Sequence, residues 1–209
     1  MINSIFMLDN FLPNDNMIIK PQKYDGYLLH QRFAFRYFGN KISPLGNIIA
    51  FRGAMEVLAD AMIDQEDKLT GAFIYSEDAI NFLWEMPILG HNAFAAVSYQ
   101  RLFNTQIANI LSREIFLNKM IKLRGDDLMV QDSEFLFGEG KCSVSITHIK
   151  DSVALGHTGI NVFAGNKGPK QAYSTKLTDM QIKAFMRQVI TMFGELNQSL
   201  FTATAKVSS

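Results

Sequence analysis

The sequence has very little cysteine, because Cys142 is the one cysteine among its 209 residues. A single cysteine excludes an internal disulfide framework and any zinc or iron–sulfur site built from clustered cysteines. The four histidines show no His-Glu-x-x-His spacing, so a helical zinc-protease site is absent as well. Nothing in the sequence therefore indicates a metal centre built from cysteine or histidine.

An excess of charge of either sign is also missing. Twenty basic and twenty acidic residues cancel, and the sequence pI is near 6.9. A domain that binds duplex nucleic acid is usually basic, so the overall charge does not indicate such binding. A local basic patch is still compatible with this composition. Weakly charged proteins often associate, which favours a homo-oligomer.

Long hydrophobic runs are absent too. No apolar run approaches the ~20 residues needed to span a bilayer. The N-terminal segment has no basic start, and Ser4, Asp9 and Asn10 interrupt its apolar residues, which makes it a poor signal peptide. The sequence predicts a cytoplasmic protein without a membrane segment.

What the sequence does have is a globular composition, with 48% hydrophobic and 19% charged residues. A chain of this length suits one large domain with a substantial core. No repeat, low-complexity segment or linker divides it. We therefore expect a single domain over residues 1–209, in which residues 1–22 form an Asn- and Pro-punctuated lead-in.

The first half of the chain predicts both strands and helices. Strands are expected at 27–38 and 47–51, separated by a turn that contains proline and glycine. A short helix is expected at 54–63. Ser76 resembles a helix N-cap followed by two acidic residues, which predicts a second helix that stops at Pro87.

Helical periodicity is clearer in the second half. Residues 92–116 place large apolar side chains on one stripe, which predicts a long helix. The last helix begins at the capping box Thr178-x-x-Gln181. Residues 199–207 favour a closing strand. Strands grouped with helices at both ends predict an α+β fold with a mainly antiparallel central sheet flanked by helices.

The most informative stretch covers residues 124–162. It contains a paired-aspartate turn, an apolar strand, a Gly-punctuated hairpin and a strand that opens on Lys141. Successive side chains of a strand point to opposite faces. The core face would carry Cys142, Val144 and Ile146. The other face would carry Lys141, Ser143, Ser145 and Thr147. A polar row headed by an amine suits a small carboxylate or phosphate, but the solvated face of an antiparallel sheet alternates in the same way.

These motifs resemble those of a known superfamily. The order Gly-Asp-Asp-Leu, Gly-Lys-Cys-Ser-Val-Ser-Ile and Gly-His-Thr-Gly-Ile-Asn-Val is similar to the distal half of the biotin and lipoate protein ligase domain, a class II aminoacyl-tRNA synthetase-like fold. More narrowly, residues 24–165 resemble the domain-of-unknown-function family numbered three-six-six, common in archaea. Further motifs of that resemblance are Arg-Tyr-Phe-Gly (36–39), Asn-Ile-Ile-Ala-Phe-Arg-Gly (47–53) and Tyr-Gln-Arg-Leu-Phe (99–103).

The ligase resemblance implies catalytic roles for two residues. In those ligases the lysine at the place of Lys141 contacts the carboxylate and the acyl-adenylate, and an ammonium there would neutralise charge during attack on the α-phosphate of ATP. Asp127 matches the aspartate of the ligases' Asn-Asp turn, and Asp126 takes the asparagine place. The two carboxylates could hold Mg²⁺, or they could cap the turn and pair with Arg124. Lys141 could equally be an exposed lysine after a glycine turn.

The same resemblance suggests substrate-binding residues. His157 lies where lipoate ligases carry a histidine pair, and Asn161 matches the asparagine of the Gly-Ile-Asn-Val strand. A buried asparagine that satisfies backbone groups is the alternative for Asn161. Ser143 and Ser145 would line the pocket. Arg52 is similar to the arginine of the ligases' arginine–glycine nucleotide loop, but the full Gly-Arg-Gly-Arg-x-Gly-Arg pattern is absent, which argues against the use of ATP.

Cys142 raises a separate possibility, because lipoyl and octanoyl transferases pair a cysteine nucleophile with a lysine. If Lys141 faces the ligand, strand alternation sends Cys142 into the core, where a thiol is inert.

Two functions from different classes stay open. The first is a ligase- or transferase-like enzyme that binds a small carboxylate and activates it with ATP as an acyl-adenylate, with a carrier protein or tRNA as acceptor. The second is a non-catalytic module that binds a small ligand or RNA and has lost nucleotide chemistry. The retained Lys141 and Asp127 favour the enzyme, and the missing glycine–arginine loop favours the module.

Overall fold

The computed structural model describes residues 16–18, 20–39, 43, 45–87 and 92–207. Its centre is a five-stranded sheet in the order β1-β2-β3-β8-β7, in which only the β1–β2 pair is parallel. These strands are β1 (Met17–Ile18), β2 (Asn47–Val57), β3 (Ile74–Met86), β7 (Ser143–Lys150) and β8 (Val153–Phe163). A smaller antiparallel sheet contains β4 (Ile121–Arg124), β5 (Asp127–Gln131) and β6 (Glu139–Lys141). The predicted α+β fold with a mainly antiparallel sheet is confirmed.

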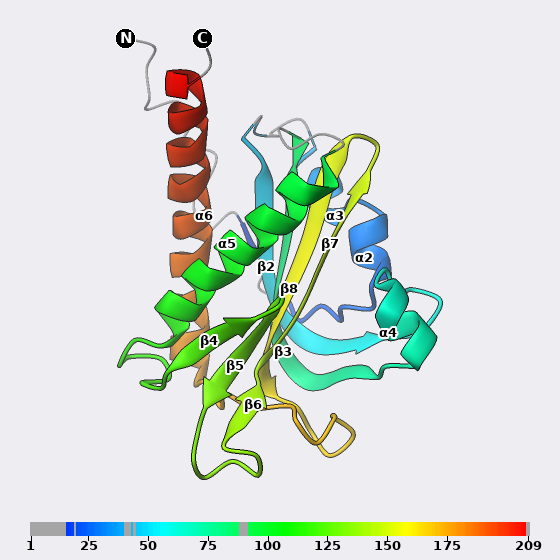
Figure 1. The fold of residues 1–209 in the computed structure, drawn as a ribbon, viewed down its shortest axis with the longest axis vertical. Coiled ribbons are helices and arrows are strands. Elements are labelled where there is room, and N and C mark those ends of the chain that lie inside the picture. The colour runs from blue at the N-terminus through cyan, green and yellow to red at the C-terminus, as the bar shows by residue number, and fades with distance from the viewer. Residues whose placement is uncertain (1–15, 19, 40–42, 44, 88–91, 208–209) are drawn as a thin grey trace.

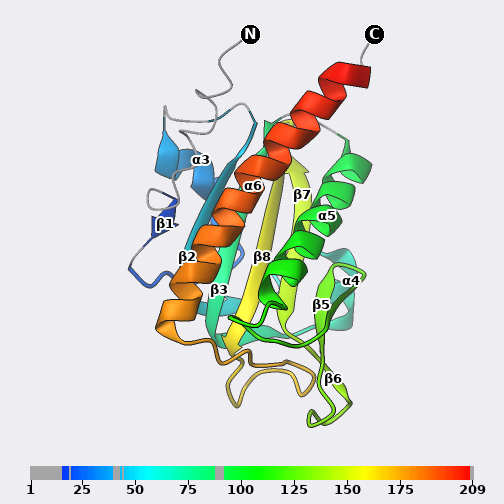
Figure 2. The ribbon, with the colours of Figure 1, turned by 90° about the vertical axis from the view of Figure 1, so that its left-hand side faces the viewer.

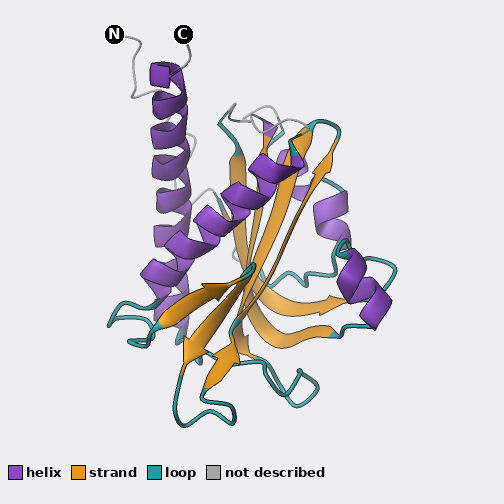
Figure 3. Cartoon of the chain, viewed as in Figure 1, coloured by secondary structure: helices purple, strands orange, loops and turns teal. Residues whose placement is uncertain are grey.

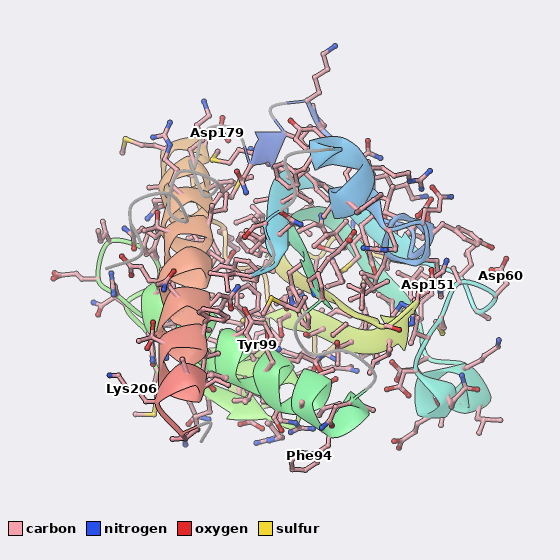
Figure 4. The ribbon with its side chains drawn as sticks, turned by 90° about the horizontal axis from the view of Figure 1, so that it is seen from above. Asp60, Phe94, Tyr99, Asp151, Asp179 and Lys206 are labelled. Atoms are coloured by element: carbon pink, nitrogen blue, oxygen red, sulfur yellow. The ribbon has the colours of Figure 1, made fainter. Side chains whose placement is uncertain are left out.

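Two long helices cover one face of the large sheet. Helix α5 (Ala93–Leu111) crosses the sheet obliquely, and α6 (Asp179–Val207) runs beside it and beyond the sheet (Figures 1 and 2). The core under them is rich in aromatic rings: Trp84 packs edge-on against Tyr99 and Phe103, and Phe103 does so against Phe193. Figure 4 shows Tyr99 on the inner side of α5, with Asp179 and Lys206 near the two ends of α6.

The opposite face of the sheet carries a second, smaller core. It lies under the short helices α2 (Tyr27–His30) and α3 (Phe33–Phe38) and the segment that follows β2, with α4 (Gln65–Thr70) nearby (Figure 3). Ile49, Phe51 and Leu83 are fully buried there. The large sheet is therefore buried on both faces, and its strands present apolar side chains in both directions.

The predicted strand at 27–38 is wrong, because these residues form α2 and α3. Double burial explains two further incorrect predictions: residues 54–57 continue β2 rather than begin a helix, and Ser76 lies within β3 rather than at an N-cap. A strand that is apolar on both faces has no clear period of two, so it can be mistaken for a helix. The Ser76 hydroxyl donates to the carbonyls of Asp78 and Phe163 instead of capping a helix.

The two long helices begin where the sequence predicts. The Asn92 side chain accepts a hydrogen bond from the Ala95 N–H (2.9 Å), and the capping box is confirmed by the Thr178 N–H, which donates to Gln181 Oε1 (2.9 Å). Helix α6 continues to Val207, so the predicted closing strand at 199–207 is wrong. Residues 1–15 of the expected lead-in lie outside the described residues. In the described part of the chain, no helix is long and apolar enough to cross a membrane.

Candidate ligand-binding site

Two neighbouring cavities lie on the face of the sheet opposite α5 and α6. The first has a volume of about 270 Å³ and is lined by residues of β2, α4, β7 and β8 and by the turn between β4 and β5. The second, of about 310 Å³, lies between the start of β3, β7 and the segment that follows β8. Four residues line both cavities: Asp67, Ile74, Lys141 and Val144. A ligand could therefore occupy both and pass Lys141 at their junction.

Backbone hydrogen bonds fix the position of Lys141. Its N–H donates to the Gln171 carbonyl (2.8 Å), and its carbonyl accepts from the Tyr173 N–H (2.8 Å). Across the β5–β6 ladder Lys141 pairs with Met129. Asp127, two residues before Met129, is thus the diagonal neighbour on the same face, within reach of a long side chain.

The Lys141 side chain forms an ion pair with Asp127, with 2.8 Å between Nζ and Oδ2. About a third of the Lys141 side chain is exposed (34%), and slightly less of Asp127 (27%). Burial raises the pKa of the Asp127 carboxyl, although the nearby Lys141 ammonium opposes the rise. Lys141 keeps two further N–H donors, so the ion pair orients the ammonium and leaves it able to bind an anion.

Asp126 lies in the two-residue turn between β4 and β5, where Arg124 pairs with Asp127. Gly125 has φ of +63°, which suits the first central position of a type II′ hairpin turn. The Asp126 carbonyl accepts a hydrogen bond from Asn104 Nδ2 of α5 (2.9 Å). Arg124 pairs with Glu139 rather than with either aspartate. Among the described residues, no group of three or more His, Cys, Asp or Glu side chains could hold a metal ion.

Ser143 and Ser145 line the two cavities, but their hydroxyls are bonded within the protein. The Ser145 hydroxyl accepts from Gln100 Nε2 (2.9 Å) and Asn104 Nδ2 (3.0 Å) of α5. The Ser143 hydroxyl accepts from the Leu128 N–H (2.8 Å). The alternation holds from Lys141 to Cys142 and breaks after Cys142, where the chain leaves β6 in one sheet and enters β7 in the other. Lys141 therefore lines the cavities together with Val144. The hydroxyls of Ser145 and Ser143 instead connect β7 to α5 and to β5.

His157 and Asn161 of β8 do face the cavities. His157 lines the first cavity, stacks on Tyr24 (3.5 Å between ring centroids) and has Nε2 3.0 Å from Asn81 Oδ1. Because an amide oxygen can only accept, Nε2 carries the proton and Nδ1 is an acceptor. That buried Nδ1 has no hydrogen-bond partner in the described structure.

Asn161 lines the second cavity. Its Nδ2 donates a long hydrogen bond to the Lys141 carbonyl (3.4 Å). Its buried Oδ1 lacks a hydrogen-bond partner among the residues described. A buried acceptor without a partner is costly, and both of these acceptors belong to residues that line a cavity.

Burial lowers the pKa of His157 to about 3, which predicts a pH-dependent stability. The unfolded chain binds a proton near pH 6.5 and the folded chain does not, so stability falls as the pH drops from about 6.5 toward 3. From pH 7 to pH 5 this group should lower the unfolding free energy by about 2 kcal/mol. Urea denaturation at both pH values measures the change. His157→Gln should flatten that dependence, and an equal slope in the variant would contradict the assignment.

Arg52 is not brought to the cavities. Its guanidinium binds Asp78 (2.7 Å) and Asp179 at the start of α6 (2.6 Å), and it lines neither cavity. The guanidinium that was predicted to bind a nucleotide is therefore already paired with two carboxylates.

Cys142 is completely buried in the core under α5 and α6, as strand alternation predicted, and burial raises the pKa of its thiol to about 12. A thiol that stays protonated and inaccessible does not act as a nucleophile. We expect no reaction with a thiol reagent in the folded protein and full reaction after unfolding in guanidinium. Rapid labelling of the native protein would show that the thiol is accessible.

The sequence matches, over residues 14–208, the family described as Domain of unknown function (DUF366). The chain belongs to this family. No protein with a curated description matches it significantly. Among solved structures it is similar to a protein of unknown function from Pyrococcus horikoshi, with a TM-score of 0.78, 23% identity, and coverage of 92% of this chain and 96% of that one.

Two ligase structures share the fold. Lipoate-protein ligase A bound with ATP has a TM-score of 0.53 and 13% identity, over 85% of this chain and 84% of that one. P. falciparum LipL1 in complex with lipoate has a TM-score of 0.51 and 17% identity, over 91% of this chain and 58% of that one. At these identities the likeness establishes a biotin/lipoate ligase-like fold for this member of DUF366.

Sequence reasoning missed three residues of the cavity region: Tyr24, Asp67 and Asn81. Tyr24 stacks on His157, Asn81 Oδ1 accepts a hydrogen bond from the His157 ring, and Asp67 borders both cavities. They come from three separate segments that only the sheet brings together. The Asp64 cap of α4, which accepts from the N–H groups of Glu66 and Asp67, was a local signal that could have located Asp67.

Proposed function

We propose that this DUF366 protein binds a small carboxylic acid beside Lys141 and activates it with ATP as an acyl-adenylate. The observation that carries the proposal is the position of Lys141, which Asp127 orients at the junction of two cavities. The structures of P. falciparum LipL1 with lipoate and of lipoate-protein ligase A with ATP support it, because both ligases share the fold.

The chemistry assigned to this site is a single displacement. A carboxylate oxygen attacks the α-phosphorus of ATP, a new P–O bond forms, and pyrophosphate leaves. The Lys141 ammonium offsets negative charge on the reacting oxygens, which is most effective where water is largely excluded. The acid would extend into the first cavity. The nucleotide would extend into the second cavity, which Asn161 lines.

One observation favours a second function, binding without chemistry. Lys141 is the one cation among the described residues that line the two cavities, and Arg52 is paired with Asp78 and Asp179 elsewhere. A triphosphate usually requires more positive charge than one lysine supplies. Under this alternative the protein binds a small ligand or RNA and has no adenylating activity.

ATP–pyrophosphate exchange distinguishes the two functions. The panel would include lipoate, octanoate, biotin and amino acids, each with the parent protein. Exchange that depends on one acid would establish activation and identify the substrate class. Calorimetric binding of an acid without any exchange would support the binding module, and a carrier protein or tRNA would be tested as acceptor only after exchange is found.

A further inference from the structure

The first cavity is strongly acidic around its single lysine. Besides the ion-paired Asp127, four carboxylates line it: Asp64, Glu66, Asp67 and Asp126. In the described part of the chain, none of these four forms a salt bridge. Asp64 is partly compensated by the N–H groups at the start of α4. Of the other three, Asp67 lies close enough to Lys141 for the ammonium to act on its carboxylate.

Asp67 is the carboxylate best placed to contact a ligand next to Lys141. It borders both cavities together with Lys141 and is half-buried. Burial raises the pKa of the Asp67 carboxyl, and the Asp64 carboxylate adds to the rise while Lys141 opposes it. A positive ligand group beside Asp67 would relieve both the burial cost and the repulsion.

A second, independent observation also points to a ligand that carries hydrogen-bond donors. His157 is 1% exposed and lines the same cavity, and its Nδ1 is an acceptor without a partner among the described residues. The residues that line the cavity thus include carboxylate oxygens and a buried imidazole nitrogen as acceptors, with Lys141 as the cation among those described. A plain fatty acid has no donor for these acceptors, and its own negative charge would be repelled by the carboxylates.

We propose that the acid bound at this site is an α-amino acid, whose carboxylate binds Lys141 and whose ammonium group binds Asp67 and Asp126. An α-amino acid places opposite charges one carbon apart, which matches a lysine flanked by carboxylates. Val57, Ile74 and Ile146 give the amino-acid side chain an apolar wall. This inference rests on the proposed binding of a carboxylate by Lys141.

Calorimetry with four probes of equal chain length tests the inference: octanoate, 2-aminooctanoate, 8-aminooctanoate and octan-2-amine. We expect 2-aminooctanoate to bind the full-length protein roughly tenfold or more tightly than octanoate. Asp67→Asn, and separately Asp126→Asn, should reduce that advantage, while Glu195→Gln on α6 serves as the matched carboxylate control. Thermal melts would establish that each variant is folded.

The outcomes separate this inference from the proposed function. Equal binding of octanoate and 2-aminooctanoate, tighter binding of 8-aminooctanoate, or an advantage unaffected by both aspartate variants would overturn the α-amino acid. If Lys141→Met does not weaken octanoate binding, the carboxylate site itself is wrong. Binding of octan-2-amine that requires Asp67 would still support recognition of the ammonium group in that case.

Discussion

Replacing Lys141 with methionine is expected to lower the rate of acid-dependent ATP–pyrophosphate exchange by roughly 100- to 1000-fold, the usual loss when one charge-stabilising donor is removed. Methionine keeps most of the length and apolar stem of lysine, so the variant removes the ammonium with little change in volume. Because Lys141 and Asp127 are both partly exposed, the free energy of unfolding should change by about 1 kcal/mol or less.

Lys122→Met is the matched control, because Lys122 is an exposed lysine on β4 that lines neither cavity. It should exchange at the parent rate. Exchange by Lys141→Met at the parent rate would show that Lys141 has no role in the reaction. Unfolding of Lys141→Met in the absence of ligand would instead show that the ion pair with Asp127 is structural.

Replacing Gly156 with alanine should destabilise the fold by about 3 kcal/mol. A methyl group at this position of β8 would overlap the ring of Trp84, which is fully buried between the sheet and α5. Trp84 cannot move aside, because it packs against the rings of Tyr99 and Phe103. For a chain of this size the melting temperature should drop by about 6–12 °C.

Trp84→Leu provides the test of mechanism. In the Gly156→Ala background it makes room for the methyl group, so the double variant should lose less stability than the sum of the single variants. Additive losses in urea denaturation would show that Gly156 and Trp84 do not act through this contact.

The parts of the fold that the sequence predicts well are those with local signals. Asn92 and the Thr178–Gln181 box mark the starts of α5 and α6 correctly, because capping depends on residues a few positions apart. Strand β2 was predicted only in part and β3 was predicted as a helix, because burial on both faces removes the alternation that identifies a strand. Helix α6 was predicted too short, because its last turns extend beyond the sheet (Figure 2), where packing no longer shapes the sequence pattern.

The site could be predicted only in part, for a similar reason. Lys141 and Asp127 belong to neighbouring strands of one hairpin, and their pairing is a short-range property of the sequence. Ser143 and Ser145 follow Lys141 in sequence, but the Ser145 hydroxyl bonds to α5 and the Ser143 hydroxyl bonds to β5, because the chain changes sheets at Cys142. Asp67 reaches the cavity from α4, and no local pattern links it to Lys141. Arg52 does not reach the cavities, because its guanidinium forms ion pairs with Asp78 and Asp179. Asp179 is 127 positions away in the sequence, so no local pattern predicts this pairing.

The most direct test of the central claim is a crystal structure of the protein with the acid that gives the strongest exchange or binding. Our account predicts that the carboxylate of the acid lies within hydrogen-bond distance of Lys141 Nζ, that Asp127 still contacts the same ammonium, and that the rest of the acid occupies the first cavity. An acid whose carboxylate lies elsewhere, with Lys141 turned away from it, would contradict the account.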